Sequence, residues 1–296
     1  MGIMNQRLLV VAALLALYFI WGSTFIGMKF AIESFPPFMM AGLRFSFAGV
    51  VLYAFLRWRG MEHPTPSQWK SAAIVGFLLL AFGNAGVAYA QQWIATGNAA
   101  MMIATVPLWT VLFDWRRGNR PRSLELCGIA LGVAGVLILN QGANLQSSPL
   151  GAVCLLLAAL AWSYGSVWSR HLEMPQGAMS SAAQMLVAGA MLMLTSLLAG
   201  ERMSEMPTPR AVYALLYLVV FGSFIAYSAY LFLLDTVRPS LATSYAFVNP
   251  LVAMGLGVWL AGEQIGRTEV LAMSVILAGV LLVMMPKASA SDNARR

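Results

Sequence analysis

Apolar residues in this chain come in long blocks separated by short polar segments. A helix needs about 20 apolar residues to cross the hydrocarbon core of a membrane, whereas transmembrane β-strands are about ten residues long and alternate in polarity. The blocks have the first length and no alternation, so they predict an all-α membrane protein. The ten predicted transmembrane helices span residues 8–28, 36–57, 70–90, 97–115, 123–141, 149–169, 177–199, 211–234, 240–261 and 267–286.

The short segments between these helices differ in positive charge. If the N-terminus is cytoplasmic, segments on the cytoplasmic side carry thirteen of the 18 Lys and Arg residues and those on the other side carry four. Because positively charged loops are retained in the cytoplasm, both termini are predicted to be cytoplasmic, including a polar tail at 287–296. The first block runs without an early cleavage site of small residues, which predicts a retained helix rather than a signal peptide.

The composition narrows the classes of function. Hydrophobic residues make up 60% of the 296 residues and charged residues only 10%, too few for the surface of a soluble domain. This excludes a soluble enzyme, a nucleic-acid-binding module and a disordered chain, and the net charge of +7 is explained by loop topology. Cys127 and Cys154 lie in apolar blocks, which favours small buried residues over a disulfide or metal site. We find no phosphate-binding loop, metal-ligand cluster or acid–base pair in the membrane interior, so no enzymatic activity, cofactor or metal is expected.

The chain resembles one five-helix unit written twice, over 8–141 and 149–286. Trp21-Gly22-Ser23 matches Tyr164-Gly165-Ser166, and Pro107-Leu108 matches Pro250-Leu251, both at an offset of 143 residues. Because five is odd, the second unit enters the membrane in the opposite direction. Inverted repeats of this kind are typical of alternating-access transporters, although receptors and scaffolds can also be built by duplication.

Three stretches carry a resemblance to a known family. They are residues 17–25 (LYFIWGSTF), residues 160–165 (LAWSYG), and residues 238–250 (RPSLATSYAFVNP) with the following Gly262-Glu263. They resemble EamA-type members of the drug/metabolite transporter superfamily over about residues 8–286. The resemblance implies a ten-helix carrier of the bacterial inner membrane with a central cavity formed by helices 1, 3, 4, 6, 8 and 9. It also implies export of amino acids, related metabolites or toxic organic compounds.

Aromatic and small polar residues inside the predicted helices are candidates for the substrate site. Rings would bind the apolar part of an amphipathic solute, and hydroxyl or amide groups would bind its polar ends. Trp and Tyr at helix ends are instead typical of headgroup anchors, the interpretation we favour for Trp58, Trp69, Trp93 and Trp115. The candidate substrate-binding residues are Tyr18, Trp21, Asn84, Tyr89, Thr105, Trp109, Trp162, Tyr164, Tyr227, Tyr230, Ser244, Tyr245 and Asn249.

Arg44 is the one charge well inside a predicted helix, eight residues after Pro36. Two interpretations stay open: it binds a substrate carboxylate or pairs in a gate, or its long side chain reaches back to the interface. Its counterpart in the second unit, Gln184, is also polar. Pro107 and Pro250 occupy equivalent mid-helix positions and are predicted to bend their helices, as gate hinges or as static bends that shape the cavity.

These observations predict an inner-membrane secondary transporter that exports small amphipathic metabolites by alternating access through an aromatic-lined cavity. Amino acids, with hydrophobic or aromatic ones favoured, are the leading substrates. Proton-coupled carriers usually hold an acid or histidine within the membrane, so the scarcity of such groups here predicts weak proton coupling. One alternative is an exporter of toxic lipophilic compounds, and another is a non-transporting scaffold or sensor. The expected partners are a small-molecule substrate and the lipid bilayer, with a homodimer as a candidate assembly and no nucleic acid.

Overall fold

The structure, a computed structural model, describes residues 3–118, 120–141, 148–237, 242 and 245–285. All its regular elements within these residues are helical, and η marks a π-helical stretch. In chain order they are α1 (Ile3–Leu15), η1 (Ala16–Trp21), α2 (Gly22–Ala31), α3 (Pro37–Trp58), α4 (Pro66–Gly76), η2 (Phe77–Asn84), α5 (Ala85–Ala90), α6 (Thr96–Ile103), α7 (Val106–Arg116), α8 (Ser123–Asn140), α10 (Pro149–Ser169), α11 (Ala178–Leu198), α12 (Pro209–Tyr217), η3 (Leu218–Ile225), α13 (Ala226–Thr236), α15 (Tyr245–Ala261) and α16 (Arg267–Met284).

Seven helical segments within the described residues are long and apolar enough to cross a membrane. Two shorter apolar helices, Ser123–Leu139 and Val248–Ala261, occupy the fifth and ninth predicted blocks, and α16 occupies the tenth. The seven long helices are Gln6–Ala31, Pro37–Trp58, Pro66–Ala90, Thr96–Arg116, Pro149–Ser169, Ala178–Leu198 and Pro209–Leu234.

Helix starts follow signals in the sequence. α3, α4, α10 and α12 each have proline in the first turn, where the missing N–H is not needed by the helix. Thr65 and Gln68 form a capping box at the start of α4, and Thr208 caps α12 by accepting from the Ala211 amide. The third membrane-spanning helix therefore begins at Pro66, four residues before the predicted boundary.

Three of the long helices contain π-helical stretches that the sequence pattern did not predict. η1 lies in the first, η2 in the third and η3 in the eighth predicted helix. η2 and η3 occupy corresponding positions in the two halves of the chain. Because π-helical turns are rare and occur mostly at functional sites, they direct attention to the region between these helices.

The two prolines predicted to bend helices behave differently. The fourth predicted helix is interrupted at Ala104 and Thr105, and Pro107 lies in the first turn of α7, directly after the interruption. Pro250 lies inside α15, which continues through it. At the first proline one helix thus ends and another starts, and proline is well tolerated in such a first turn.

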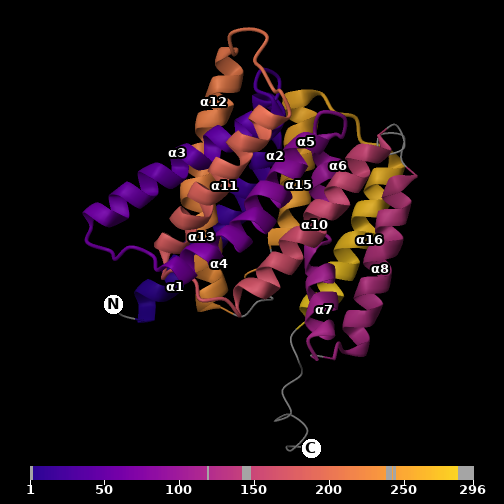
Figure 1. Cartoon of the computed structure of the whole chain (residues 1–296). Helices are drawn as coiled ribbons and strands as arrows, with labels where there is room; N and C mark the ends of the chain where they lie inside the picture. Colours follow the sequence, from indigo (N-terminus) through magenta and orange to yellow (C-terminus); the bar gives the residue numbers. More distant parts are fainter. Residues whose placement is uncertain (1–2, 119, 142–147, 238–241, 243–244, 286–296) are drawn as a thin grey trace, which may run out of the picture.

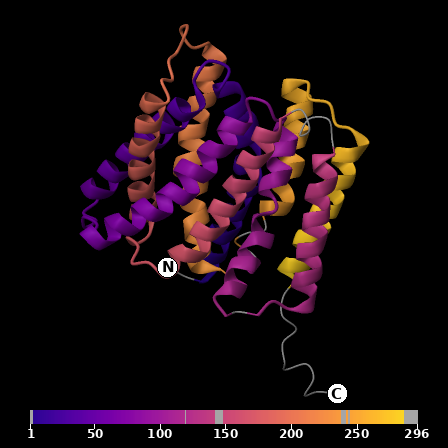
Figure 2. The ribbon, with the colours of Figure 1, turned by 45° about the vertical axis from the view of Figure 1, so that its right-hand side comes forward.

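Equivalent helices of the two halves pack against each other in opposite directions. A Cβ placed on Gly42 of α3 would touch Met193 of α11, and one on Gly49 would touch Leu186, so residue numbers rise along one helix as they fall along the other. α8 and α16 pack in the same manner, with Gly132 close to Gly279. Figures 1 and 2 show these two pairs at opposite edges of the bundle.

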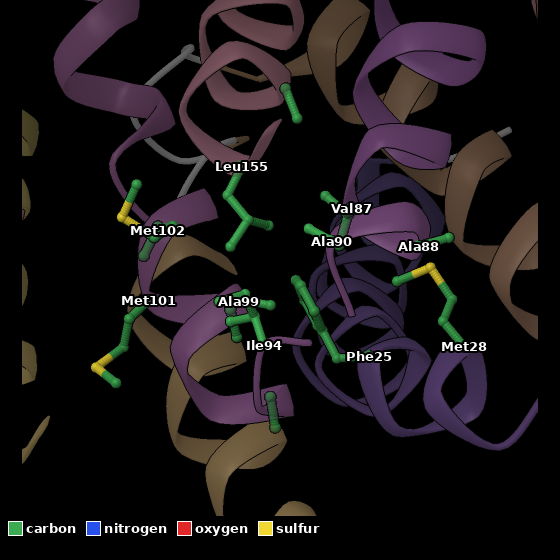
Figure 3. Packing of buried hydrophobic residues seen from close by; sticks show 14 of the residues in the cluster. Phe25, Met28, Val87, Ala88, Ala90, Ile94, Ala99, Met101, Met102 and Leu155 are labelled. Carbon is green, nitrogen blue, oxygen red and sulfur yellow. The ribbon is translucent and has the colours of Figure 1, made fainter. Parts of the chain in front are cut away.

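Apolar side chains fill the centre between these pairs. The largest cluster of buried residues joins α2, α5, α6, α10, α15 and neighbouring helices. Figure 3 shows Phe25 of α2, Ile94 and Leu155 of α10 around its interior. The start of α1 and the end of α16 lie at the same end of the molecule, the lower end in Figure 1.

Candidate functional site

Four aromatic side chains from four helices meet in the middle of the bundle. The ring of Trp21 lies 5.6 Å from that of Trp162, 5.0 Å from Tyr230 and 5.0 Å from Tyr245, measured between centroids. Two of these contacts are edge-to-face, the arrangement that aromatic quadrupoles favour. All four were predicted as substrate-binding residues, and we call them the aromatic cluster.

A cavity with a volume of about 60 Å³ lies against this cluster. Predicted site residues in its wall are Trp21, Asn84, Trp162, Tyr245 and Asn249. Since one water molecule needs about 10–15 Å³ of such space, the cavity holds a few waters in this conformation and would have to widen for a metabolite. We call it the central cavity.

Two polar groups in the wall of the central cavity have different surroundings. The indole nitrogen of Trp162 is buried and makes no hydrogen bond of ordinary geometry with any described residue. The Asn249 amide, in the orientation that matches its neighbours, donates to the carbonyl oxygens of Leu17, Tyr18 and Tyr245. Two of these carbonyls belong to the first helix at η1, so Asn249 ties α15 to this π-helical stretch.

Arg44 is buried, with 2% of its surface exposed, and points into the bundle from α3. Its Nε donates to Ser223 Oγ at 2.8 Å, and its Nη1 donates to Asn84 Oδ1 at 3.1 Å. Ser223 belongs to η3 and Asn84 to η2, so Arg44 joins two π-helical stretches from opposite halves. This position contradicts the interpretation that the side chain reaches back to the membrane interface.

Gln184, the counterpart of Arg44, makes similar connections. It accepts a hydrogen bond from the Tyr227 hydroxyl, and its amide nitrogen donates to Ser180 at 2.9 Å. A Cβ placed on Gly76 would lie only 2.8 Å from the backbone carbonyl oxygen of Gln184. Both residues therefore connect the third and eighth predicted helices, and Tyr227 is occupied by this contact.

Several predicted site residues lie away from the central cavity. Tyr164 is 37% exposed and packs on Phe113 and Trp168, because two residues along a helix turn it by about 200° from Trp162. Trp109 donates to Thr105 Oγ1 at 3.0 Å beside the interruption in the fourth helix.

Three further candidates complete this account. Tyr89 stacks on Phe38 with centroids 5.3 Å apart, in the last turns of α5, and Tyr18 is half-buried against the aromatic cluster. Ser244 lies outside the described residues.

Sequence reasoning missed other residues in the wall of the central cavity. Thr24 and Met28 follow Trp21 at helical spacing, on the face that also carries the wall residue Phe25, so that face could have identified them. Ser223 does not line the cavity but binds Arg44, and it gave no signal, because one serine in an apolar block is indistinguishable from others. The remaining apolar wall residues are Gly83, Val87, Ile103 and Ala158.

A larger cavity of about 520 Å³ lies near the lower end of the molecule in Figure 1. Its wall includes the segment between α10 and α11, from Ser169 to Gly177, and reaches Gln184 and Leu79 in the interior. Leu79 belongs to η2, one turn before the residues that line the central cavity. We call it the lower cavity.

At the opposite end of the molecule, carboxylates from the second half of the chain bind helix starts in the first half. Glu201, after α11, accepts from the backbone N–H groups of Phe38 and Met39 at 3.1 and 2.8 Å. Glu263, after α15, accepts from those of Thr96 and Gly97 at 2.7 and 3.3 Å. Negative charge at a helix N-terminus is stabilised by its unpaired N–H groups and dipole.

Arg210 adds a third connection at this end. Its Nη1 lies 3.8 Å from Glu33 Oε1, and its guanidinium stacks on the ring of Phe30, 3.5 Å from the centroid. The upper end in Figure 1 is thus held by three charged side chains of the second half, whereas the lower end contains the larger cavity.

Within the described part of the chain, no three His, Cys, Asp or Glu residues are grouped closely enough to hold a metal ion. Cys127 is exposed and Cys154 half-buried, and both are free thiols. The chemistry available at the central cavity is therefore binding by rings, amides, hydroxyls and one nearby guanidinium.

The sequence profile of the EamA-like transporter family matches residues 8–141 and 149–285. The chain belongs to this family. EamA proteins form part of the drug/metabolite transporter superfamily, so the predicted family is confirmed. As an EamA protein with at least seven apolar helices, the chain is a multi-pass membrane transporter of the bacterial inner membrane, the predicted location.

Relatives of this EamA protein extend over almost the whole chain. It is 46% identical over 284 residues to the uncharacterized inner membrane transporter YedA of Escherichia coli strain K12, covering 96% of this chain and 93% of YedA. It is 24% identical over 282 residues to the uncharacterized transporter YoaV of Bacillus subtilis strain 168, covering 92% and 96%. A solved crystal structure, 21% identical, covers 98% of both chains with a TM-score of 0.65, which supports the fold.

Proposed function

We propose that this EamA protein is a secondary transporter that exports small amphipathic metabolites, with amino acids bearing hydrophobic or aromatic side chains as the leading class. The observation that carries the proposal is the aromatic cluster beside the central cavity, built from both halves of the chain. Rings provide apolar contact area for a side chain, and nearby amides and indole N–H provide polar contacts. All proposed contacts lie within one chain, so a homodimer is not required.

Alternating access through two inverted five-helix units supplies the mechanism. Support comes from the antiparallel packing of α3 with α11 and of α8 with α16, and from the family match to each half separately. Inverted units can exchange conformations and expose the site between them to each side in turn. The interruption before Pro107 and the proline within α15 are the hinges we propose for this exchange.

The direction of opening follows from charge and cavities together. The lower end in Figure 1 carries the start of α1, the end of α16 and the lower cavity, and the positive-charge bias assigns that end to the cytoplasm. A metabolite would enter there and reach the central cavity past Leu79. Release on the other side would require the contacts of Glu201 and Glu263 to open.

Counterflow in proteoliposomes tests the proposal. We expect exchange of labelled aromatic and aliphatic amino acids, and a reduction of at least about tenfold at limiting substrate in Trp21→Ala and Trp162→Ala, because buried aromatic anchors dominate binding energy. Trp58→Ala is the matched control, since Trp58 is 80% exposed at the end of α3. Exchange should persist without a pH gradient, because no acidic residue is among the described residues lining the central cavity.

The outcomes separate the candidate functions. Exchange of lipophilic toxic compounds alone would replace the substrate class with the first alternative. Absence of exchange for both groups of solutes would favour a scaffold or sensor. Strict dependence on a pH gradient would contradict the proposed weak proton coupling.

A further inference from the structure

We propose that the wall of the central cavity at Asn84 is a carboxylate-binding site, held at positive potential by Arg44, and that it selects solutes by their carboxylate rather than by an amino group. This inference rests on the proposed transport function and narrows its substrate class. It predicts binding of both zwitterionic and simple monocarboxylates with an apolar tail, and weak binding of amines.

The first argument is the uncompensated charge of Arg44. Its hydrogen-bond partners, Ser223 and Asn84, are neutral, and its guanidinium also lies near the ring of Phe45, 4.8 Å from Cζ. The ion pairs among the described residues involve Arg122 and Arg210. A buried charge is costly unless an opposite charge accompanies it, so the site favours an anion brought by the solute.

The second argument is that Asn84 transmits this charge to the cavity. Its Oδ1 accepts from Arg44 Nη1, and its amide nitrogen donates to no described residue. Asn84 also lines the central cavity, where that nitrogen can donate to a solute. An amide whose oxygen is bound to a guanidinium is polarised and is therefore a stronger donor.

The third argument is a second donor beside the first. The buried indole nitrogen of Trp162 makes no hydrogen bond of ordinary geometry with the described residues, and its neighbours are the hydroxyls of Tyr230 and Tyr245. Trp162 packs against Gly83, where a Cβ would lie 3.3 Å from its ring, and Gly83 precedes Asn84. Two N–H donors from residues that line the central cavity, close to a buried cation, match the oxygens of a carboxylate.

The fourth argument is the lack of a matching site for an ammonium group. No Asp or Glu is among the described residues that line the central cavity, and Glu201 and Glu263 are engaged with backbone N–H groups at the upper end. Rings can contact a cation, but Arg44 repels it. The site therefore discriminates for the carboxylate and tolerates loss of the amine.

Isothermal titration of the purified full chain in nanodiscs tests this with three probes of similar shape: L-phenylalanine, 3-phenylpropionate and phenethylamine. We expect both carboxylates to bind and the amine to bind at least about tenfold more weakly. Arg44→Gln should weaken both carboxylates by at least about 30-fold and leave the amine unchanged or improved. Arg44→Lys should recover part of the affinity, because the charge returns without the second N–H prong. Arg59→Gln, an exposed charge at the end of the same helix, is the matched control.

Asn84→Asp keeps the proposal testable if Arg44→Gln does not fold. The new carboxylate is similar in shape to the amide and pairs with Arg44, so the protein should remain folded while carboxylate affinity falls to the level of the amine. Equal binding of amine and carboxylates, unchanged affinity in Arg44→Gln or Asn84→Asp, or no binding of either carboxylate would overturn the proposal. Counterflow of a solute without a carboxylate that still depends on Trp21 and Trp162 would overturn it too and leave the proposed transport function intact.

Discussion

The side chain of Arg44 fits in the interior of the bundle because Gly222, which lies against it, has no side chain. A Cβ on Gly222 would lie 2.8 Å from Arg44 Nη2 and 3.0 Å from Thr24 Cγ2. The carbonyl oxygen of Gly222 also lies 3.4 Å from the indole nitrogen of Trp21. One position without a side chain therefore accommodates the guanidinium and connects it to the aromatic cluster.

Gly222→Ala tests this arrangement. The added methyl should displace the guanidinium and lower the free energy of unfolding by about 1–3 kcal/mol, the usual cost of an overpacked interior. Thermal unfolding in detergent measures this, together with the affinity for 3-phenylpropionate, which we expect to fall. Gly255→Ala is the control, since a Cβ there meets nothing within 4 Å and should leave stability unchanged or raised. Equal stability of the two variants would contradict the role of Gly222.

At the scale of residues, the sequence predicts the rings better than the polar groups. Trp21 and Trp162 stand out because each lies well inside an apolar block, too far from the lipid headgroups to act as an anchor. Asn249 was predicted to bind substrate, yet its amide bonds backbone carbonyls at η1. That need arises only after the first helix widens into a π-helix, which residue types alone do not reveal.

Close packing between equivalent helices depends on glycines at their crossing points. A Cβ on Gly279 of α16 would lie 2.6 Å from the Gly128 carbonyl oxygen and 2.8 Å from the Gly132 amide nitrogen of α8. These neighbours are backbone atoms and cannot turn aside. Small residues that let helix backbones approach are a common device of membrane helix pairs.

Gly279→Ala should force α8 and α16 apart and lower the unfolding temperature, with a cost of about 1–3 kcal/mol. Gly86→Ala is a suitable comparison, because its Cβ would meet Ala158 at an ordinary 3.4 Å. Thermal unfolding of both variants measures the difference. A Gly279→Ala protein as stable as Gly86→Ala would show that the pair separates without cost.

Helices were predictable as elements, because length and hydropathy decide them locally. Their interruptions were only partly predictable. Pro107 indicated a bend, whereas η2 and η3 carry no proline and are apolar except for Asn84 in the first and Ser223 in the second. The contacts of Asn84 and Ser223 with Arg44 lie in these stretches, so the irregularity belongs to packing between helices rather than to local sequence.

For the whole molecule, the contacts of Glu201 and Glu263 decide which end is closed. Each carboxylate spans the two halves and binds two backbone N–H groups. Neutral amides in these positions would form weaker hydrogen bonds, because charge-assisted bonds are about twice as strong. The population that opens toward the upper end should therefore rise.

The double variant Glu201→Gln, Glu263→Gln tests this in a background lacking Cys127 and Cys154. A cysteine at Thr24, in the wall of the central cavity, should react about fivefold faster with a membrane-impermeant thiol reagent added from the outside. Glu205→Gln, an exposed acid in the same segment as Glu201, should leave the rate unchanged. A rate in the double variant equal to that of the parent protein would contradict closure by these carboxylates.

The antiparallel packing of α3 with α11 and of α8 with α16 could be anticipated from the five helices predicted for each unit and from the matched motifs. The closure at one end could not, since Glu201 and Glu263 lie 62 residues apart in segments that look like ordinary loops. Their roles depend on which helix starts lie opposite them, and this is set only when the bundle assembles.

The π-helical stretches are places where a membrane-crossing helix can change its register. A π turn stores a surplus residue relative to an α turn, and passing that residue to the neighbouring segment advances the helix by about 1.5 Å and screws it by about 100°. In η2 and η3 such a step would rotate the side chains of the shifted segment, while the ends of the helix stay at the bilayer surfaces. A register shift of this kind would change which side chains face the interior without requiring the whole helix to tilt.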